Sequence, residues 1–176
     1  MGGTNRDSGL TSGLESALMT DVDNPKEGID LRPDGGVHLW LDGTKHRLRR
    51  PRAREVRKLR EELEDRLDTI NSAADEAARW AEALQARGDE REQNEQPRVT
   101  DVERAEDRRQ GRSLRDLTES ELAGWWLSVV ATLAVTDNGT SPDMDADDMP
   151  LWLASVQQAS AVLDHWRTSP SLSGAP

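Results

Sequence analysis

Apolar residues spaced seven apart over a long segment restrict the fold of this chain more than any other feature. Val56, Leu63, Ile70, Ala77 and Leu84 form this series. The three- and four-residue steps between them are filled by Leu59, Leu67, Ala73, Ala74, Trp80 and Ala81. With Pro51 before it and Gly88 after it, the pattern predicts an amphipathic helix of about 36 residues, roughly 54 Å long. The apolar seam could pair with another chain as a coiled coil or pack against later helices of the same chain.

A β-hairpin is predicted just before this helix. Val37–Leu41 and Thr44–Leu48 are short, partly apolar runs joined by Asp42-Gly43. Asp-Gly readily supplies the two positive φ angles of a type I′ turn. This turn places Leu41 opposite Thr44, Leu39 opposite His46 and Val37 opposite Leu48, so one face of the hairpin is mainly apolar and must pack on something.

Two shorter helices that contain tryptophan are predicted after the long one. Residues 122–135 (LAGWWLSVVATLAV) are apolar on nearly every face, which is typical of a helix buried between neighbours. Thr118 and Glu121 have the spacing of a capping box before this segment. Pro150 is expected to open the last helix, on whose apolar face lie Trp152, Val156, Ala159, Leu163 and Trp166.

Polar segments separate these elements. Only 34% of the 176 residues are hydrophobic and 32% are charged, a balance at which part of a chain cannot bury enough apolar surface to stay ordered. We expect a disordered arm over residues 1–35, charged spacers over 88–112 and 137–149, and a tail over 168–176. The spacer over 88–112 is either a linker or a frayed extension of the long helix. Between arm and tail, residues 36–167 are expected to form one mainly α domain: a β-hairpin, the long amphipathic helix and the two shorter helices.

The sequence offers no constellation typical of catalysis. It has no cysteine, and its three histidines are dispersed, with His38 and His46 on opposite faces of the hairpin and His165 far along the chain. The acidic run near Asp143 lacks the glycine and the final glutamate of a calcium-binding loop. We therefore expect no catalytic residues, metal site or cofactor. Neither a signal peptide nor a membrane span is predicted, and the absence of cysteine fits the cytosol.

A basic stretch interrupts this acidic chain. Residues 45–60 hold nine bases and one acid, a net charge of +8, so the rest of the chain carries −19. Such a stretch could meet the phosphates of a nucleic acid, with Arg49, Arg50 and Arg52 as candidate contacts. The pI near 4.8 and the lack of a recognised nucleic-acid-binding motif weigh against this hypothesis. The same bases could instead meet acidic segments of this chain or of a protein partner.

Several short motifs resemble those of one protein family. They are Leu39-Trp40-Leu41-Asp42-Gly43, Arg47-Leu48-Arg49-Arg50-Pro51-Arg52, the Trp125-Trp126 helix, Met149-Pro150-Leu151-Trp152-Leu153 and His165-Trp166-Arg167-Thr168-Ser169-Pro170. With the long charged helix and the acidic spacer between them, they resemble the tail assembly chaperones of long-tailed phages that infect actinobacteria, over about residues 36–174.

The resemblance implies a non-enzymatic role in the cytoplasm of the infected host. The protein would bind the helical tape measure protein and help to recruit tail-tube subunits, and this chain looks like the short form of such chaperones. Tryptophan is enriched among binding hot spots, so Trp125, Trp126, Trp152 and Trp166 are candidate anchors for a partner, beside Arg49, Arg50 and Arg52. Packing of these tryptophans inside the chain is the alternative. A coiled-coil structural protein and a nucleic-acid-binding module are the rival functions, and homo-oligomerisation is compatible with each.

Overall fold

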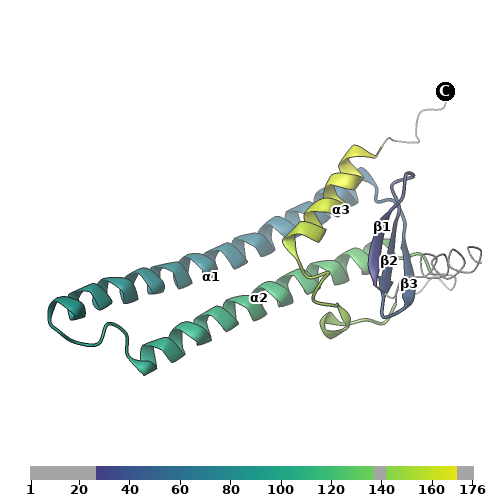
Figure 1. Cartoon of the computed structure of the whole chain (residues 1–176). Coiled ribbons are helices and arrows are strands. Elements are labelled where there is room, and N and C mark those ends of the chain that lie inside the picture. The colour runs from purple at the N-terminus through teal and green to yellow at the C-terminus, as the bar shows by residue number, and fades with distance from the viewer. Residues whose placement is uncertain (1–26, 137–141, 170–176) are drawn as a thin grey trace, which may run out of the picture.

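The protein is mainly helical, with a small antiparallel sheet at its N-terminal side (Figure 1). The structure, a computed structural model, describes residues 27–136 and 142–169. Its elements are β1 (Gly28–Leu31), β2 (Val37–Leu41), β3 (Thr44–Leu48), α1 (Ala53–Gln93), α2 (Asp101–Leu133), the short 3₁₀ helix η1 (Ala146–Asp148) and α3 (Val156–Thr168). The arm over residues 1–26, the centre of the second spacer and the tail from residue 170 lie outside the described residues.

The sheet confirms the predicted hairpin and its register. β2 and β3 pair with Val37 opposite Leu48, Leu39 opposite His46 and Leu41 opposite Thr44. Asp42 and Gly43 have φ angles of 47° and 75°, as a type I′ turn requires.

The arm, in contrast, does not extend to residue 35. Residues 28–31 form β1, which adds a third strand beside β2 in the order β1-β2-β3. This strand has only four residues, which is too short for an alternation of apolar and polar residues to predict it from the sequence. Its pairing places Ile29 opposite Leu39 and Leu31 opposite Val37, which gives the strand apolar neighbours only in the folded sheet.

Helices α1 and α2 form a long antiparallel hairpin, which we call the stalk (Figure 1). The face of α1 that carries the seven-residue series lies toward α2, with Leu59, Leu63, Ile70 and Leu84 buried. The predicted long helix is thus present, and its seam is occupied by α2 of the same chain rather than by a second chain.

The first predicted spacer is mostly helical, so the linker interpretation is wrong for most of it, while an extension of the long helix holds for residues 88–93. Helix α1 continues to Gln93 and α2 starts at Asp101, so only residues 94–100 connect them. Gly88 does not end α1. It lies where the connection returns, because a Cβ there would be 3.3 Å from the carbonyl oxygen of Arg98. Charged residues of 88–112 pair across the connection, as Arg91 with Glu103, and within α2, as Arg104 with Asp101 and Arg109 with Glu106.

The start of α2 also differs from the prediction. Its capping box is formed by Thr100 and Glu103, while Thr118 and Glu121 lie inside the helix. The Thr118 hydroxyl donates to the carbonyl oxygen of Leu114, and Glu121 pairs with Arg66 of α1. Both pairs have the spacing of a capping box, and the sequence pattern alone does not distinguish them.

The last helix begins later than expected. Pro150 opens a turn, in which its carbonyl oxygen accepts from the backbone N–H groups of Leu153 and Ala154. Helix α3 starts at Val156 with Ser155 as its N-cap, whose side chain accepts from the N–H of Gln158. Trp152 therefore belongs to the preceding turn, and Val156 is exposed.

The main core lies at one end of the stalk, in a region we call the head: the sheet, α3, the turn before it and the adjoining ends of α1 and α2 (Figure 1). The residues that follow α2 close this region, because Ala134 forms an isolated β-bridge with Leu48. In this bridge the N–H of Val135 donates to the carbonyl oxygen of Arg47, and the N–H of Arg49 donates to that of Leu133. The far end of the stalk projects away from the head.

Candidate partner-binding surfaces

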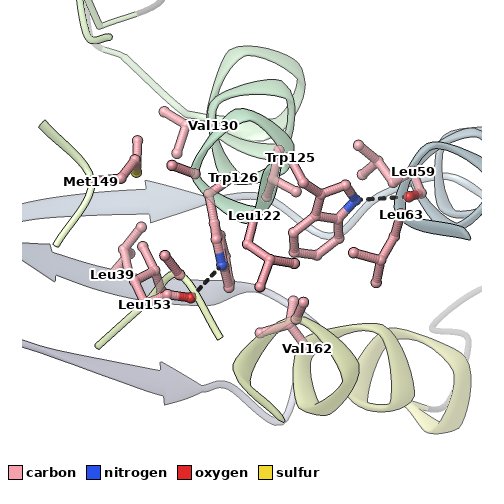
Figure 2. Close-up of a cluster of buried hydrophobic side chains, with 14 of the residues drawn as sticks. Leu39, Leu59, Leu63, Leu122, Trp125, Trp126, Val130, Met149, Leu153 and Val162 are labelled. Atoms are coloured by element: carbon pink, nitrogen blue, oxygen red, sulfur yellow. Dashed lines mark hydrogen bonds between the residues drawn. The ribbon is translucent and has the colours of Figure 1, made fainter. Parts of the chain in front are cut away.

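Trp125 and Trp126 lie in the centre of the head, with exposed fractions of 0% (Figure 2). Their rings meet edge to face at 5.0 Å, an arrangement favoured by the ring quadrupoles. The Trp125 indole nitrogen donates to the carbonyl oxygen of Leu59 in α1 at 2.8 Å. That of Trp126 donates to Leu153 in the opposite direction, also at 2.8 Å. The two hydrogen bonds therefore connect α2 to α1 on one side and to the turn before α3 on the other. Trp125 and Trp126 thus pack inside the chain, which is the alternative to a role as exposed anchors for a partner.

The other two candidate tryptophans lie nearer to the edge of the core. Trp166 of α3 is 4% exposed and Trp152 is half-buried against the main cluster. The indole nitrogens of both are buried and have no hydrogen-bond partner among the described residues. Of the four candidate anchors, only Trp152 keeps appreciable surface.

Arg49, Arg50 and Arg52 lie where the sheet meets α1, and all three have roles within the chain. The Arg49 guanidinium forms two hydrogen bonds to Glu55, at 2.8 and 2.7 Å, and a third to the carbonyl oxygen of Thr132. Its hydrogen bonds hold the pKa of Glu55 at about 2, while Glu55 raises the pKa of Arg49. Arg50 donates to the carbonyl oxygen of Ser169, and Arg52 is the N-cap of α1, where its backbone N–H donates to Glu55. The exposed side chain of Arg52 forms no hydrogen bond or ion pair within the described residues.

Other bases of the same stretch are exposed and unpaired. The side chains of Arg47, Arg54, Arg57 and Lys58 form no ion pair or hydrogen bond within the part of the chain that the structure describes. Three of them lie in the first two turns of α1, beside the positive end of its dipole, where cations are unfavourable. The exposed basic surface is therefore centred on Arg54, Arg57 and Lys58, with the exposed Arg52 side chain beside them, whereas Arg49 and Arg50 are held by contacts within the chain.

The histidines do not form a joint site. His38 lies on the outer face of the sheet, 3.7 Å from Asp30, whereas His46 lies opposite Leu39 on the core side. Burial lowers the pKa of both imidazoles, and Lys45 lowers that of His38 further. Within residues 27–136 and 142–169, no cluster of three or more acidic, histidine or cysteine side chains could hold a metal ion. No described helix is long and apolar enough to cross a membrane.

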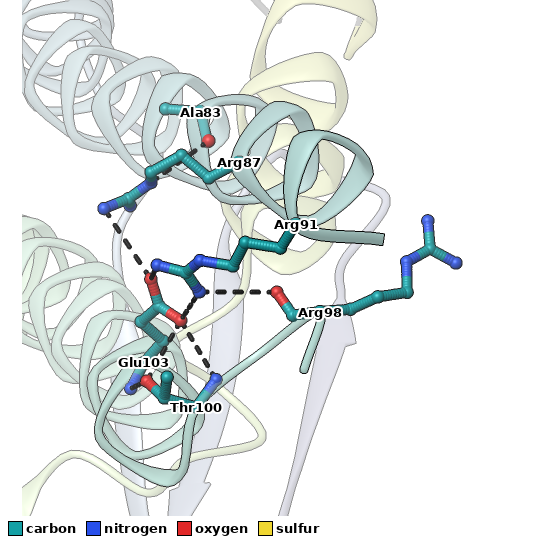
Figure 3. A network of polar contacts seen from close by, with 6 residues as sticks. All are labelled: Ala83, Arg87, Arg91, Arg98, Thr100 and Glu103. Carbon is teal, nitrogen blue, oxygen red and sulfur yellow. Dashed lines mark hydrogen bonds and ion pairs between the residues drawn. The ribbon is translucent and has the colours of Figure 1, made fainter. Parts of the chain in front are cut away.

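A polar network fixes the far end of the stalk (Figure 3). Glu103 accepts hydrogen bonds from the Arg91 guanidinium at 2.6 and 2.9 Å and from the backbone N–H of Thr100 at 3.0 Å. The Arg87 guanidinium lies 3.7 Å away. These hydrogen bonds, above all those from Arg91, hold the pKa of Glu103 at about 2. One carboxylate thus joins the end of α1 to the start of α2.

The structure also contains a groove that the sequence did not predict. It lies between α2 and the segment from η1 to the turn before α3. Ala123 contributes from α2, and Met149, Leu151 and Ala154 contribute from a segment about 28 residues later. The Met149–Leu153 motif was visible in the sequence, but residues so far apart form one surface only after folding.

Comparison with known proteins gives no relative: no family model, no curated protein and no solved structure matches this chain.

Proposed function

We propose that this chain is a tail assembly chaperone of the type made by long-tailed actinobacterial phages. It acts without catalysis in the host cytoplasm, binds the tape measure protein and helps to recruit tail-tube subunits. The proposal starts from the motifs over residues 36–174, which are mostly gathered in the head.

The geometry that best supports this function is the stalk. At 1.5 Å per residue, α1 is about 60 Å long and α2 about 50 Å. A hairpin of this length offers an extended surface along which a long helical client can lie, and many side chains of its outer faces are exposed and charged. Helix-on-helix contact is a common mode of peptide recognition. The tightly packed head would keep the stalk in a fixed position.

Co-expression with the tape measure protein encoded in the same genome tests this function. A soluble complex that elutes as one species in size-exclusion chromatography, with both chains present, is the expected result. A second co-expression, with an unrelated acidic helical protein of similar size, controls for general solubilisation. A tape measure protein that is equally insoluble with and without this chain would refute the function.

Nucleic-acid binding is a second candidate because Arg54, Arg57 and Lys58 are exposed and unpaired within the described residues. If these bases contact phosphates, replacing all three by alanine should weaken binding and reduce its dependence on salt. Arg49 is a poor choice for this test because its loss would also break the contacts with Glu55 and Thr132. Absence of binding at low salt would exclude this candidate.

A further inference from the structure

We propose that the groove between α2 and residues 146–154 is a docking site for a basic amphipathic helix of a partner protein. This inference rests on the proposed function, since it names a surface in the head, in addition to the stalk, by which the chain would hold its helical client. The groove has a volume of about 300 Å³.

The floor of the groove is apolar and its residues are small or flexible. Ala123, Met149 and Ala154 form this floor, and all three are buried. Leu151 stands beside them and is 69% exposed, although it is a large apolar side chain next to an apolar surface. Covering Leu151 and the floor with an apolar side chain of a partner would remove both from water.

The polar residues of the groove favour positive charge. Asp116, Glu119 and Asp147 belong to its lining, which contains no basic residue. Their carboxylates form no ion pair or hydrogen bond within the described part of the chain. Elsewhere many carboxylates are paired, as Glu55, Glu103 and Glu121 are. Three free carboxylates beside an apolar floor are complementary to lysine or arginine that flanks an apolar residue.

A helix with one apolar stripe between basic residues combines these two properties in one ligand. Such a helix places its apolar side chains in a groove and its charges at the rim. A second copy of this chain fits less well. A second copy has a net charge of −11, which opposes its approach to three free carboxylates. We therefore assign the groove to a different protein.

A synthetic peptide tests the groove directly. The probe is a fluorescein-labelled helix of leucine, lysine and alanine with one leucine stripe flanked by lysines, and binding is measured by fluorescence anisotropy at physiological salt. A second peptide with the same charges has each leucine replaced by alanine. We expect the chain to bind the leucine peptide at least tenfold more tightly. Equal binding of the two peptides would mean that the net charge of −11 alone attracts them, and would overturn the proposal.

Matched variants locate the binding. Leu151→Asp should weaken binding of the leucine peptide at least tenfold, whereas Val102→Asp, at a residue 79% exposed at the far end of the stalk, should not. Glu119→Lys should weaken binding more than Glu61→Lys, which makes the same change of charge on the exposed face of α1. Circular dichroism checks that each variant is folded; the replaced side chains are exposed or half-buried, so folding should be retained. Equal affinities within either pair would overturn the assignment.

The same variants separate this inference from the proposed function. If the wild-type chain and Leu151→Asp hold the tape measure protein equally well, the function stands and the groove assignment fails. If the peptide binds in the groove but no tape measure complex forms, the docking site stands and the function fails. A concentration-dependent dimer that Leu151→Asp abolishes would instead assign the groove to a second copy and overturn the proposal.

Discussion

Replacing Trp126 by phenylalanine tests whether the paired tryptophans hold the head together. The change removes the hydrogen bond from the indole to the carbonyl oxygen of Leu153, and it leaves a gap where the outer six-membered ring of the indole lay. Leu153 keeps a second donor, the backbone N–H of Ser155, so its oxygen is not left unsatisfied. The lost hydrogen bond is worth about 1 kcal/mol. The lost packing is worth about 2 kcal/mol, since truncating a buried aromatic side chain to alanine costs roughly 3–5 kcal/mol.

We therefore expect the free energy of unfolding to fall by about 3 kcal/mol, which corresponds to a decrease in Tm of about 6–12 °C. Urea unfolding followed by far-ultraviolet circular dichroism measures the first quantity, and a thermal scan measures the second.

Trp80→Phe is the matched control for this measurement. Trp80 is half-buried on α1, and its side chain forms no hydrogen bond among the described residues, so the cost should stay below about 1 kcal/mol. A cost for Trp126→Phe as small as that for Trp80→Phe would refute the assignment of Trp126 to the core.

Three further outcomes follow from the geometry. Glu103→Gln should weaken the far end of the stalk, which would be detected as faster amide hydrogen exchange there. In the unchanged chain the pKa of Glu103 is about 2, below its ordinary value of 4.5. The stabilising effect of the Glu103 carboxylate is therefore fully present above pH 4.5 and is lost as the pH falls toward 2. Gly43→Ala should destabilise the β2–β3 turn by about 1 kcal/mol, since φ is 75° there, and an unchanged urea midpoint would contradict this. Gly124→Ala brings a Cβ to 2.7 Å from the Arg66 guanidinium, so urea unfolding should show less than the roughly 1 kcal/mol gain that alanine usually brings to a helix; the full gain would show that Arg66 moves freely.

The candidate site could be predicted from the sequence only in part. The sequence singles out the tryptophans, but whether they pack inside the chain or face a partner depends on neighbours far along the chain. Trp125 and Trp126 reach Leu59 and Leu153, respectively. The basic stretch was visible as well, yet only the structure separates Arg49, which is committed to Glu55, from the unpaired Arg54. The groove joins residues of α2 to residues of a later segment and has no counterpart in the sequence pattern.

Local patterns alone determined the β2–β3 hairpin and the long first helix. The Asp42-Gly43 turn sets the register of the hairpin, and seven-residue spacing marks one face of a helix without reference to the rest of the chain. Tertiary structure decided which partner covers that face, that residues 28–31 join the sheet, and that residues 101–112 are helical. These outcomes depend on distant pairs such as Ile29 with Leu39 and Arg91 with Glu103. Such a pair lowers the free energy of the folded chain only once folding has brought its two members into contact. The sequence pattern of either segment alone therefore cannot predict its contribution.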